Sequence, residues 1–178
     1  MSPTNEPIVR RSWGLRKING LTAATGFSYE EFATTKSAFR GIATSLTWFV
    51  FGLSMALIPP VRWLMKQILP SSGGGPPRDK LEQGWFEVVN VSEARGVVAK
   101  STLKGKRGDP GYFLTSWMIF ESALLLLDPN NLTPLGRQGG ILTPSIAFGN
   151  RLVEALEATG RFEATSEIVG NEESKKTR

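Results

Sequence analysis

Two residue types are missing from this chain of 178 residues, cysteine and histidine. Without cysteine the chain forms no disulfide and has no thiol nucleophile. Without histidine it lacks the commonest general base and the commonest metal ligand. A Ser-His-Asp hydrolase and a zinc site are therefore excluded, and we expect no metal site.

Several functional signatures are also missing. The first twenty residues hold no apolar stretch of the kind that a secretory signal needs. No G-x-G-x-x-G lies between a strand and a helix, so the chain carries no dinucleotide-binding fingerprint. The glycines of Gly73–Gly75 are not followed by Gly-Lys-Ser/Thr, which a phosphate loop would require. We read residues 70–84 as a loop instead.

Positive charge exceeds negative charge, with a net charge of +5. It gathers before residue 18 and again before residue 108, in Arg10, Arg11, Arg16, Lys17, Lys100, Lys104, Lys106 and Arg107. These residues form either a solvated rim or a surface for an anionic partner such as a membrane. Because aromatic residues do not alternate with them on one element, and no recognition motif appears, we expect no nucleic-acid partner.

The segment from Gly108 to Leu127 has the clearest pattern. Asp109 suits a helix N-cap, and Pro110 then falls at the first helical position. The apolar run that follows repeats at steps of three and four, in Phe113, Trp117, Phe120, Leu124 and Leu127. A helix that is apolar on most of its circumference is predicted to be a central, buried one.

The start of this helix is the candidate site. Free N–H groups at a helix start favour an anion, and Lys106 and Arg107 stand just before it. Tyr112 is the candidate catalytic residue, because a phenol can donate a proton or a hydrogen bond. The alternative is that Asp109 and the glycines only cap and bend the chain while Tyr112 packs. Glu121 finds a buried partner such as an arginine, or else acts as a base.

Residues 41–61 form a second conspicuous segment, twenty-one residues without a charge, GIATSLTWFVFGLSMALIPPV. Its length passes the threshold of about eighteen for a transmembrane candidate. Four hydroxyl residues and Pro59-Pro60 count against a span. The alternatives are a long helix packed on a sheet or one lying along a membrane surface. After Pro60 the pattern continues as a more amphipathic helix.

The remaining patterns predict an α+β fold, with a mainly antiparallel or mixed sheet and helices packed on one face. A single domain spans residues 8–169. The predicted segments are a loose start (1–7), a strand (8–16), a short strand (27–32), a helix from near Thr35, a hairpin (85–91 and 97–103), a loop (128–142), a helix from Thr143-Pro144 to Gly160, a strand (162–168) and a polar tail (170–178). In the short strand, Ser28 and Glu31 also fit a helix capping box.

Several motifs occur in an order that resembles a known family. They are GDPGY with T-x-x-M-x-x-ESAL from Gly108 to Leu124, G-x-L-T-P-x-x-A-x-G-x-x-L-x-x-x-L from Gly140 to Leu156, and the pieces RRSWGL, FSYEEF and GGGP before GWFEV. Together they resemble the C-terminal half of the saccharopine dehydrogenase-like oxidoreductases, a group that includes the trans-acting enoyl reductases of lipid synthesis. The resemblance spans nearly the whole chain.

The resemblance implies a substrate-side domain whose cofactor is NAD(P), with the family's Rossmann half absent here. It implies that Gly108, Asp109, Pro110, Gly111 and Thr115 help to bind the cofactor once a Rossmann domain or a partner chain supplies the other side. We expect no cofactor to bind this chain alone. The family's links to glycolipid synthesis, membranes and lipid droplets also imply a membrane-associated or lipid-droplet location for residues 41–61, with the cytoplasm as the alternative.

Two functions follow. The first is the substrate-side domain of an NAD(P)-dependent lipid oxidoreductase, not catalytic alone. The second is a non-enzymatic module on a membrane or lipid-droplet surface.

Overall fold

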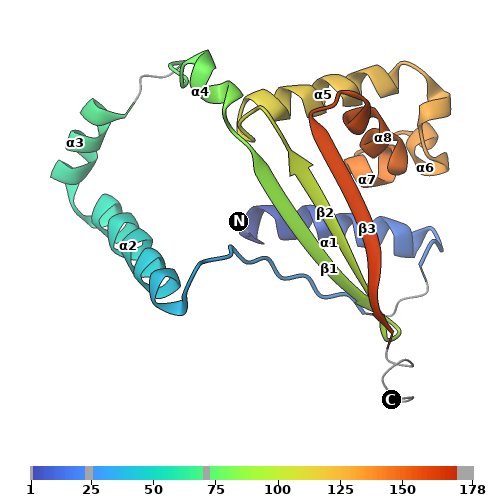
Figure 1. The fold of residues 1–178 in the computed structure, drawn as a ribbon, viewed down its shortest axis with the longest axis horizontal. Coiled ribbons are helices and arrows are strands. Elements are labelled where there is room, and N and C mark those ends of the chain that lie inside the picture. The colour runs from blue at the N-terminus through green and yellow to red at the C-terminus, as the bar shows by residue number, and fades with distance from the viewer. Residues whose placement is uncertain (1, 23–25, 70–72, 172–178) are drawn as a thin grey trace. The chain divides into compact units, whose positions relative to one another are not determined.

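The computed structural model describes residues 2–22, 26–69 and 73–171, and Figure 1 shows its fold. The helices are α1 (Ser2–Ile18), α2 (Ala38–Leu57), α3 (Pro59–Ile68), α4 (Arg78–Glu82), α5 (Phe113–Leu126), the 3-10 helix η1 (Pro129–Asn131), α6 (Pro134–Gln138), α7 (Pro144–Ala147) and α8 (Asn150–Ala158). The strands are β1 (Phe86–Ala94), β2 (Val97–Gly105) and β3 (Phe162–Asn171).

The chain divides into two compact units rather than the single domain that we expected over residues 8–169. Unit 1 comprises Met1–Glu6 and Tyr29–Pro76, and unit 2 comprises Pro7–Ser28 and Pro77–Arg178. Unit 2 is therefore built from two segments of the chain that α2 and α3 separate. The last residues of the predicted tail, 172–178, lie outside the described part.

The sheet of unit 2 confirms the predicted α+β class. Its order is β1-β2-β3, and both pairs are antiparallel. The hairpin between β1 and β2 turns at Arg95 and Gly96, which have φ values of 52° and 76°. Positive φ at both central residues belongs to the two-residue turns that match the twist of a hairpin. The predicted hairpin and final strand are thus confirmed, each somewhat longer than expected.

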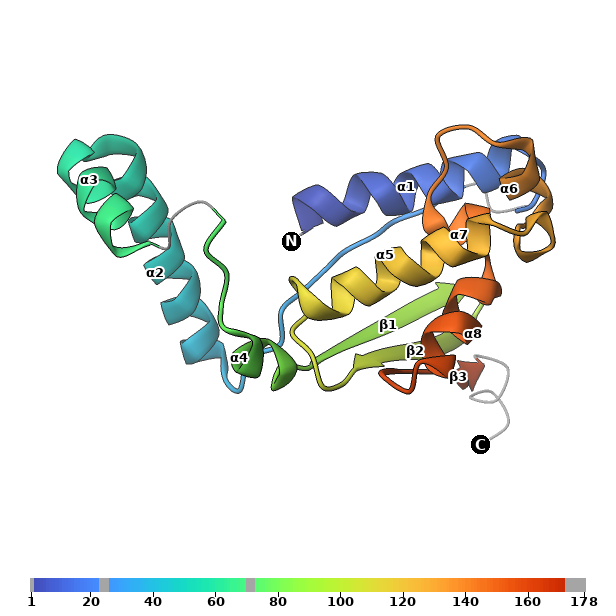
Figure 2. The same cartoon turned by 90° about the horizontal axis from the view of Figure 1, so that it is seen from above.

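The core of unit 2 forms where Phe86, Gly105 and Phe162 lie side by side on the three strands. Leu114 of α5, which is 0% exposed, and Leu156 of α8 pack on this row, so that both helices lie on one face of the sheet. Figure 2 shows α5 along that face. A Cβ on Gly105 would stand 2.2 Å from the Phe86 ring and 2.6 Å from Leu114. Only glycine therefore allows the helix to approach this closely.

The opposite face of the sheet is polar. Lys104 of β2 pairs with Glu87 of β1 at 3.2 Å. Lys100 of β2 lies 3.9 Å from Glu167 of β3. All four side chains are well exposed, so each pair adds little to stability. A sheet with one apolar and one charged face is typical of an antiparallel sheet that is covered on one side.

Helix α5 is less buried than its composition predicts. Within it only Leu114 and Leu125 are buried. Large apolar side chains on its other faces are exposed, namely Ile119, Phe120, Leu124 and Leu126. The prediction of a central, buried helix is wrong, because the sheet and α8 cover only one side of α5 in the described residues.

The N-terminal predictions are also wrong. Residues 2–7, expected to be a loose start, and residues 8–16, expected to be a strand, belong to the helix α1. Alternation over nine residues does not distinguish a strand from a helix that continues on both sides. The helix ends where Gly20 takes a φ of 68° and the N–H of Leu21 bonds the carbonyl of Arg16 at 2.8 Å.

The short strand expected over residues 27–32 is absent, and those residues have no regular secondary structure. Phe27 stacks on Trp13 of α1, with 5.6 Å between the ring centroids. The aromatic side chain that suggested a strand packs on a helix instead.

The apolar segment predicted over residues 41–61 is helical, but in two pieces. Helix α2 begins after Ser37, whose hydroxyl accepts the N–H of Arg40 at 3.3 Å. It ends at Ile58, because proline follows at positions 59 and 60. The more amphipathic continuation is confirmed as α3.

Two predicted loops contain short helices. The loop over residues 70–84 includes α4, and the loop over residues 128–142 includes η1 and α6. The Asp128 carboxylate accepts the N–H of Asn130, and the Thr133 hydroxyl accepts that of Gly136, each at 2.9 Å. These caps, each followed by proline, start a helix without an apolar run to signal it. The helix predicted from residue 144 to 160 is divided into α7 and α8 at Gly149, which has a φ of 56°.

Candidate functional site

The predicted site lies at the corner between β2 and α5, residues 105–115. Backbone bonds fix this corner to two other segments. The N–H of Gly108 bonds the carbonyl of Gly84 at 2.8 Å, and the N–H of Asp109 bonds that of Leu81 at 2.7 Å. The N–H of Lys106 bonds the carbonyl of Arg161 at 2.8 Å. Three stretches of unit 2 thus meet at the corner.

Asp109 caps the corner as predicted, although by a different geometry. Its carboxylate accepts the N–H groups of Gly111, Tyr112 and Phe113 at 2.9, 3.0 and 2.9 Å. Pro110 is not the first helical residue, because α5 begins only at Phe113. The bond from the Phe113 N–H is the largest cause that lowers the pKa of Asp109, and those from Tyr112 and Gly111 add to it.

This cap changes the expected anion site. The backbone donors at the start of α5 would bind a phosphate or carboxylate only if they were free. Here the Asp109 carboxylate already accepts three of them and brings its own negative charge to the place. In this arrangement the helix start serves as a cap and offers no vacant anion site.

The two basic residues before the corner also have partners. Lys106 donates to the Glu163 carboxylate on β3, and this hydrogen bond is the main cause that lowers the pKa of Glu163. Arg107 has a φ of 53° and donates to the carbonyl of Gly160 at 3.1 Å. Both cations therefore tie the corner to the chain around residue 160.

Arg161 is a residue of the corner that the sequence gave no reason to select. Its guanidinium donates to the carbonyl of Arg107 at 2.9 Å. The same group lies over the rings of Phe113 and Trp117, at 4.9 and 5.1 Å from their centroids. A planar cation that stacks on two aromatic rings and bonds a carbonyl stabilises the first turn of α5. No local signal marks it, because its partners are more than forty residues away.

Tyr112 and Thr115 differ in availability. Tyr112 is 63% exposed, and its hydroxyl has no hydrogen-bond partner among the described residues. Thr115 donates its hydroxyl to the carbonyl of Pro110. Of the predicted site residues, Tyr112 is therefore the one with a free functional group, whereas Gly108 is buried against Phe113 and Leu114.

Glu121 does not have the buried partner, such as an arginine, that was one of its two predicted roles. It is half-buried, and no ion pair or hydrogen bond reaches its carboxylate from the described part of the chain. Glu121 follows Leu114 by seven residues and precedes Leu125 by four, so it shares the face of α5 that packs on the core. Within the described residues no group of three acidic side chains could hold a metal ion.

The chain is similar to two proteins of Mycobacterium tuberculosis, from strains H37Rv and CDC 1551. Each is named "Putative trans-acting enoyl reductase". Each is 33% identical over 171 residues, which cover 90% of this chain and 38% of the relative. The chain thus spans well under half the length of the curated relatives that it matches.

These relatives support the enoyl reductase part of the resemblance. Their names do not mention saccharopine dehydrogenase, so that part stays a prediction. No family model matches the chain. No solved structure matches it either.

Proposed function

We propose that this chain is the substrate-side part of an NAD(P)-dependent lipid oxidoreductase of the saccharopine dehydrogenase-like group, which reduces an enoyl double bond. The observation that carries the proposal is the 33% identity, over 90% of the chain, to relatives named as enoyl reductases. The relatives' remaining length leaves room for a cofactor-binding part. We propose that a Rossmann domain in another segment or a partner chain supplies it.

The exposed side of α5 supports the proposed arrangement. Phe120 and Leu124 are 55% and 44% exposed on a helix whose other side packs on the core. Tyr112 stands exposed at the start of the same helix. The apolar side chains lie about 12 Å or more along the helix from the free phenol, a spacing that suits an acyl chain with its reacting group at the phenol end. These residues would line one side of a site that a second domain completes.

Reduction of an enoyl group adds a hydride to one carbon of the double bond and a proton to the other. NAD(P)H supplies the hydride in the proposed reaction. Tyr112 is the described corner residue with a free hydroxyl, so it is the candidate to donate the proton or to hold the substrate's carbonyl. The corner's glycines and Asp109 would then position Tyr112 rather than bind the cofactor phosphates.

A segment replacement tests the proposal. The matching segment of the mycobacterial relative is replaced by this chain, and the chimera is assayed for NADPH oxidation at 340 nm with a 2-enoyl thioester. We expect turnover that depends on the inserted chain and drops about 100-fold or more with Tyr112→Phe. Tyr29→Phe, which removes the hydroxyl of the chain's other tyrosine at a half-buried position outside the corner, serves as the matched control.

NADPH binding and the circular dichroism spectrum of the chimera show whether a loss of turnover is due to misfolding. A chimera that binds NADPH and shows the native circular dichroism spectrum, yet turns over no enoyl substrate, contradicts the proposal. That outcome would favour the second candidate function, a non-enzymatic module on a membrane or lipid-droplet surface. The observation behind that candidate is α2, which has no buried residue.

A further inference from the structure

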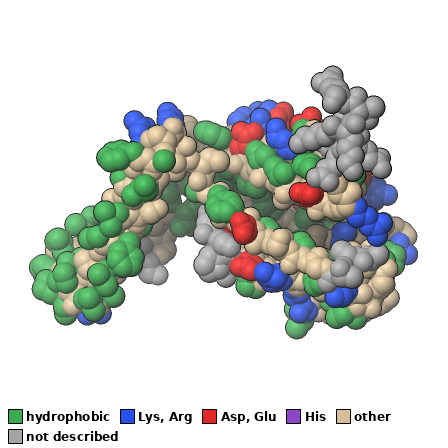
Figure 3. All heavy atoms as spheres, turned by 90° about the horizontal axis from the view of Figure 1, so that it is seen from below, with side chains coloured by type: hydrophobic (Ala, Val, Ile, Leu, Met, Phe, Trp, Pro, Cys, Tyr) green, Lys and Arg blue, Asp and Glu red, His purple; other side chains and the backbone are tan. Residues whose placement is uncertain are grey.

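Helix α2 is the one described helix long and apolar enough to cross a membrane. None of its 20 residues is buried. Its large side chains are exposed all round, and α3 continues the exposure with Trp63, Leu64 and Ile68. Figure 3 shows hydrophobic side chains gathered over these two helices. An exposed apolar surface of this extent marks a site for a partner or for lipid.

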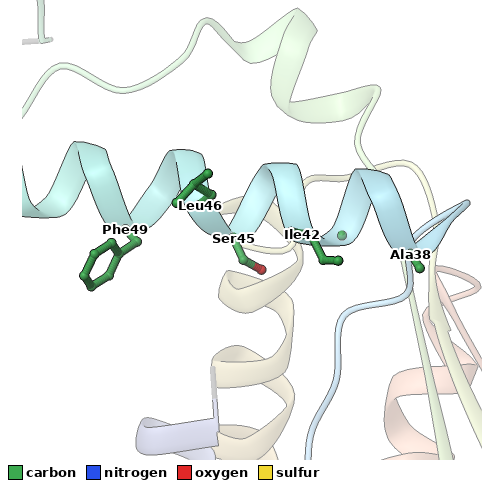
Figure 4. A pocket seen from close by; sticks show the side chains of 6 residues that line it. Ala38, Ile42, Ser45, Leu46 and Phe49 are labelled. Atoms are coloured by element: carbon green, nitrogen blue, oxygen red, sulfur yellow. The ribbon is translucent and has the colours of Figure 1, made fainter.

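The apolar surface of α2 is continuous along the helix axis. Ala38, Ile42, Ser45 and Phe49 line a shallow hollow on one side, and Figure 4 shows them in a row. Trp48 and Phe51 stand elsewhere on the helix, 6.0 Å apart edge to face. A helix that binds a protein groove needs one apolar stripe, whereas a helix in lipid is apolar all round.

Charge specifies the kind of lipid. Between Ala33 and Leu69 the sequence holds the cations Lys36, Arg40, Arg62 and Lys66 and no acidic residue. Two of them stand at the start of α2, and the other two stand on α3. Cations at the ends of an apolar segment complement the phosphates of anionic phospholipids.

The polar groups within the segment are compatible with hydrocarbon. At the bend between α2 and α3, Pro59 and Pro60 have no N–H to leave unpaired. The N–H of Ile58 bonds the carbonyl of Ser54 at 2.9 Å, and that of Val61 bonds the carbonyl of Ile58 at 3.1 Å. The hydroxyls of Thr47 and Ser54 donate to carbonyls of the same helix, each at 2.8 Å. The bend therefore exposes few backbone donors to lipid, as a membrane-seated segment requires.

The connectivity of unit 2 decides how the segment meets the bilayer. Residues 7–28 precede α2 and residues 77–178 follow α3, yet they form one compact unit. Across the two segments, the hydroxyls of Ser12 and Thr143 are 2.8 Å apart, and Arg11 donates to the carbonyl of Ile141. Both ends of the α2–α3 segment must therefore lie on the same side of a membrane.

A single span by α2 would need a second crossing to return. Helix α3 has 10 residues, about 15 Å, which is half the hydrocarbon thickness, and it carries Arg62 and Lys66. Residues 69–77, LPSSGGGPP, are not a spanning sequence either. We infer that α2 and α3, Ala38–Ile68, insert together into one leaflet of an anionic phospholipid bilayer, entering and leaving at the same face. This inference does not rest on the proposed reductase activity.

Vesicle flotation tests the insertion. The full chain is mixed with vesicles of phosphatidylcholine alone or with an equal share of phosphatidylglycerol. We expect it to float with the anionic vesicles, and Ile42→Ser with Phe49→Ser to weaken binding about tenfold or more. Both side chains are exposed, so folding is preserved. Ile141→Ser, at an apolar residue of unit 2 that is even more exposed, is the control that leaves binding unchanged.

The charge requirement has its own variant. Arg62→Glu with Lys66→Glu should weaken binding to the anionic vesicles by about fivefold or more per charge. An equal affinity for both vesicle types, or no flotation of the unchanged chain, would overturn the inference.

The absence of cysteine makes the topology measurable. Ser28→Cys and Ser92→Cys, both at exposed positions of unit 2, are combined in one chain, which is reconstituted into sealed vesicles. A membrane-impermeant maleimide is added, and labels per molecule are counted by mass spectrometry. Insertion into one leaflet gives molecules with two labels or none, whatever their orientation. A population with one label each, which gains the second only after detergent, would show a span and refute the inference.

Discussion

The carboxylate of Asp109 accepts the backbone N–H of Phe113, with 2.9 Å between Oδ1 and N. Its second oxygen accepts the N–H groups of Gly111 and Tyr112. One side chain thus satisfies three donors at the start of α5 and shapes the corner that presents Tyr112. The stability of this corner should respond both to mutation and to pH.

Asp109→Ala should lower the melting temperature by a few degrees, because three backbone donors lose their acceptor. Asp109→Asn should cost less, since one amide oxygen remains. Thermal unfolding followed by circular dichroism measures both. Equal melting temperatures for all three chains would show that solvent replaces the cap without loss.

The ionisation of Asp109 should also make the stability of the chain depend on pH. The pKa of Asp109 is lower in the folded chain than its ordinary value, so its contribution is complete above that ordinary value, near 4. The contribution is lost as the pH falls through the folded pKa. Melting temperatures from about pH 2.5 to 7 should therefore fall less steeply on the acid side in Asp109→Asn than in the unchanged chain.

Arg161→Ala should destabilise unit 2 by about 1–3 kcal/mol, through loss of the bond to Arg107 and of the stacking on Phe113 and Trp117. Arg161→Lys keeps the charge but not the planar group, so it should recover only part of the loss. Chemical denaturation of the three chains measures the difference. A lysine variant as stable as the unchanged chain would mean that charge alone matters here.

Gly136→Ala and Gly14→Ala should act in opposite directions. A Cβ on Gly136 would lie 2.4 Å from the carbonyl oxygen of Ala147, a backbone atom that cannot move freely. We expect a loss of about 1–3 kcal/mol. Gly14 lies inside α1 with no atom within 4 Å of an added Cβ, and alanine should stabilise it by about 0.5–1 kcal/mol. If Gly14→Ala also destabilises the chain, the space around Gly14 is not open, contrary to the structure.

The contact between Ser12 and Thr143 should show measurable coupling. Thr143 is only 6% exposed, and the two hydroxyls are 2.8 Å apart. In a double-mutant cycle with Ser12→Ala and Thr143→Val, we expect a coupling energy of about 0.5–1.5 kcal/mol. A value near zero would indicate that α1 is not held against the start of α7, and would weaken the topological argument for insertion into one leaflet.

Local patterns predicted the parts of the fold that local chemistry determines. The turn at Arg95-Gly96 and the alternating residues around it identified the hairpin, and the sequence Gly-Asp-Pro-Gly identified the cap at Asp109. The α1 helix was missed because nine alternating residues fit both periodicities. The burial of α5 was overestimated, since composition shows that a face is apolar but not whether another element covers it.

The partners of the corner could not be predicted. Arg161, Glu163 and Gly84 reach it from distant positions in the chain. Arg161 and Glu163 stand in no motif, and the piece GWFEV that begins at Gly84 gives no sign that its carbonyl bonds the corner. At the helix start, the N–H groups suggested either an anion site or a cap, and the Asp109 carboxylate accepts three of them. The sequence contained the residue that occupies them, Asp109, but a cap and a ligand site begin with the same pattern.

The division of unit 2 into two segments also orders its folding. The hairpin joins neighbouring residues, whereas Ser12 and Thr143 are 131 positions apart, and contacts of such separation cost more chain entropy to close. The sheet, α5 and α8 should therefore assemble first and α1 should dock last. During synthesis, α2 and α3 leave the ribosome before any strand of the sheet exists. These helices are thus free to meet a lipid surface while unit 2 is still incomplete, and its closure around α1 would then take place beside the membrane.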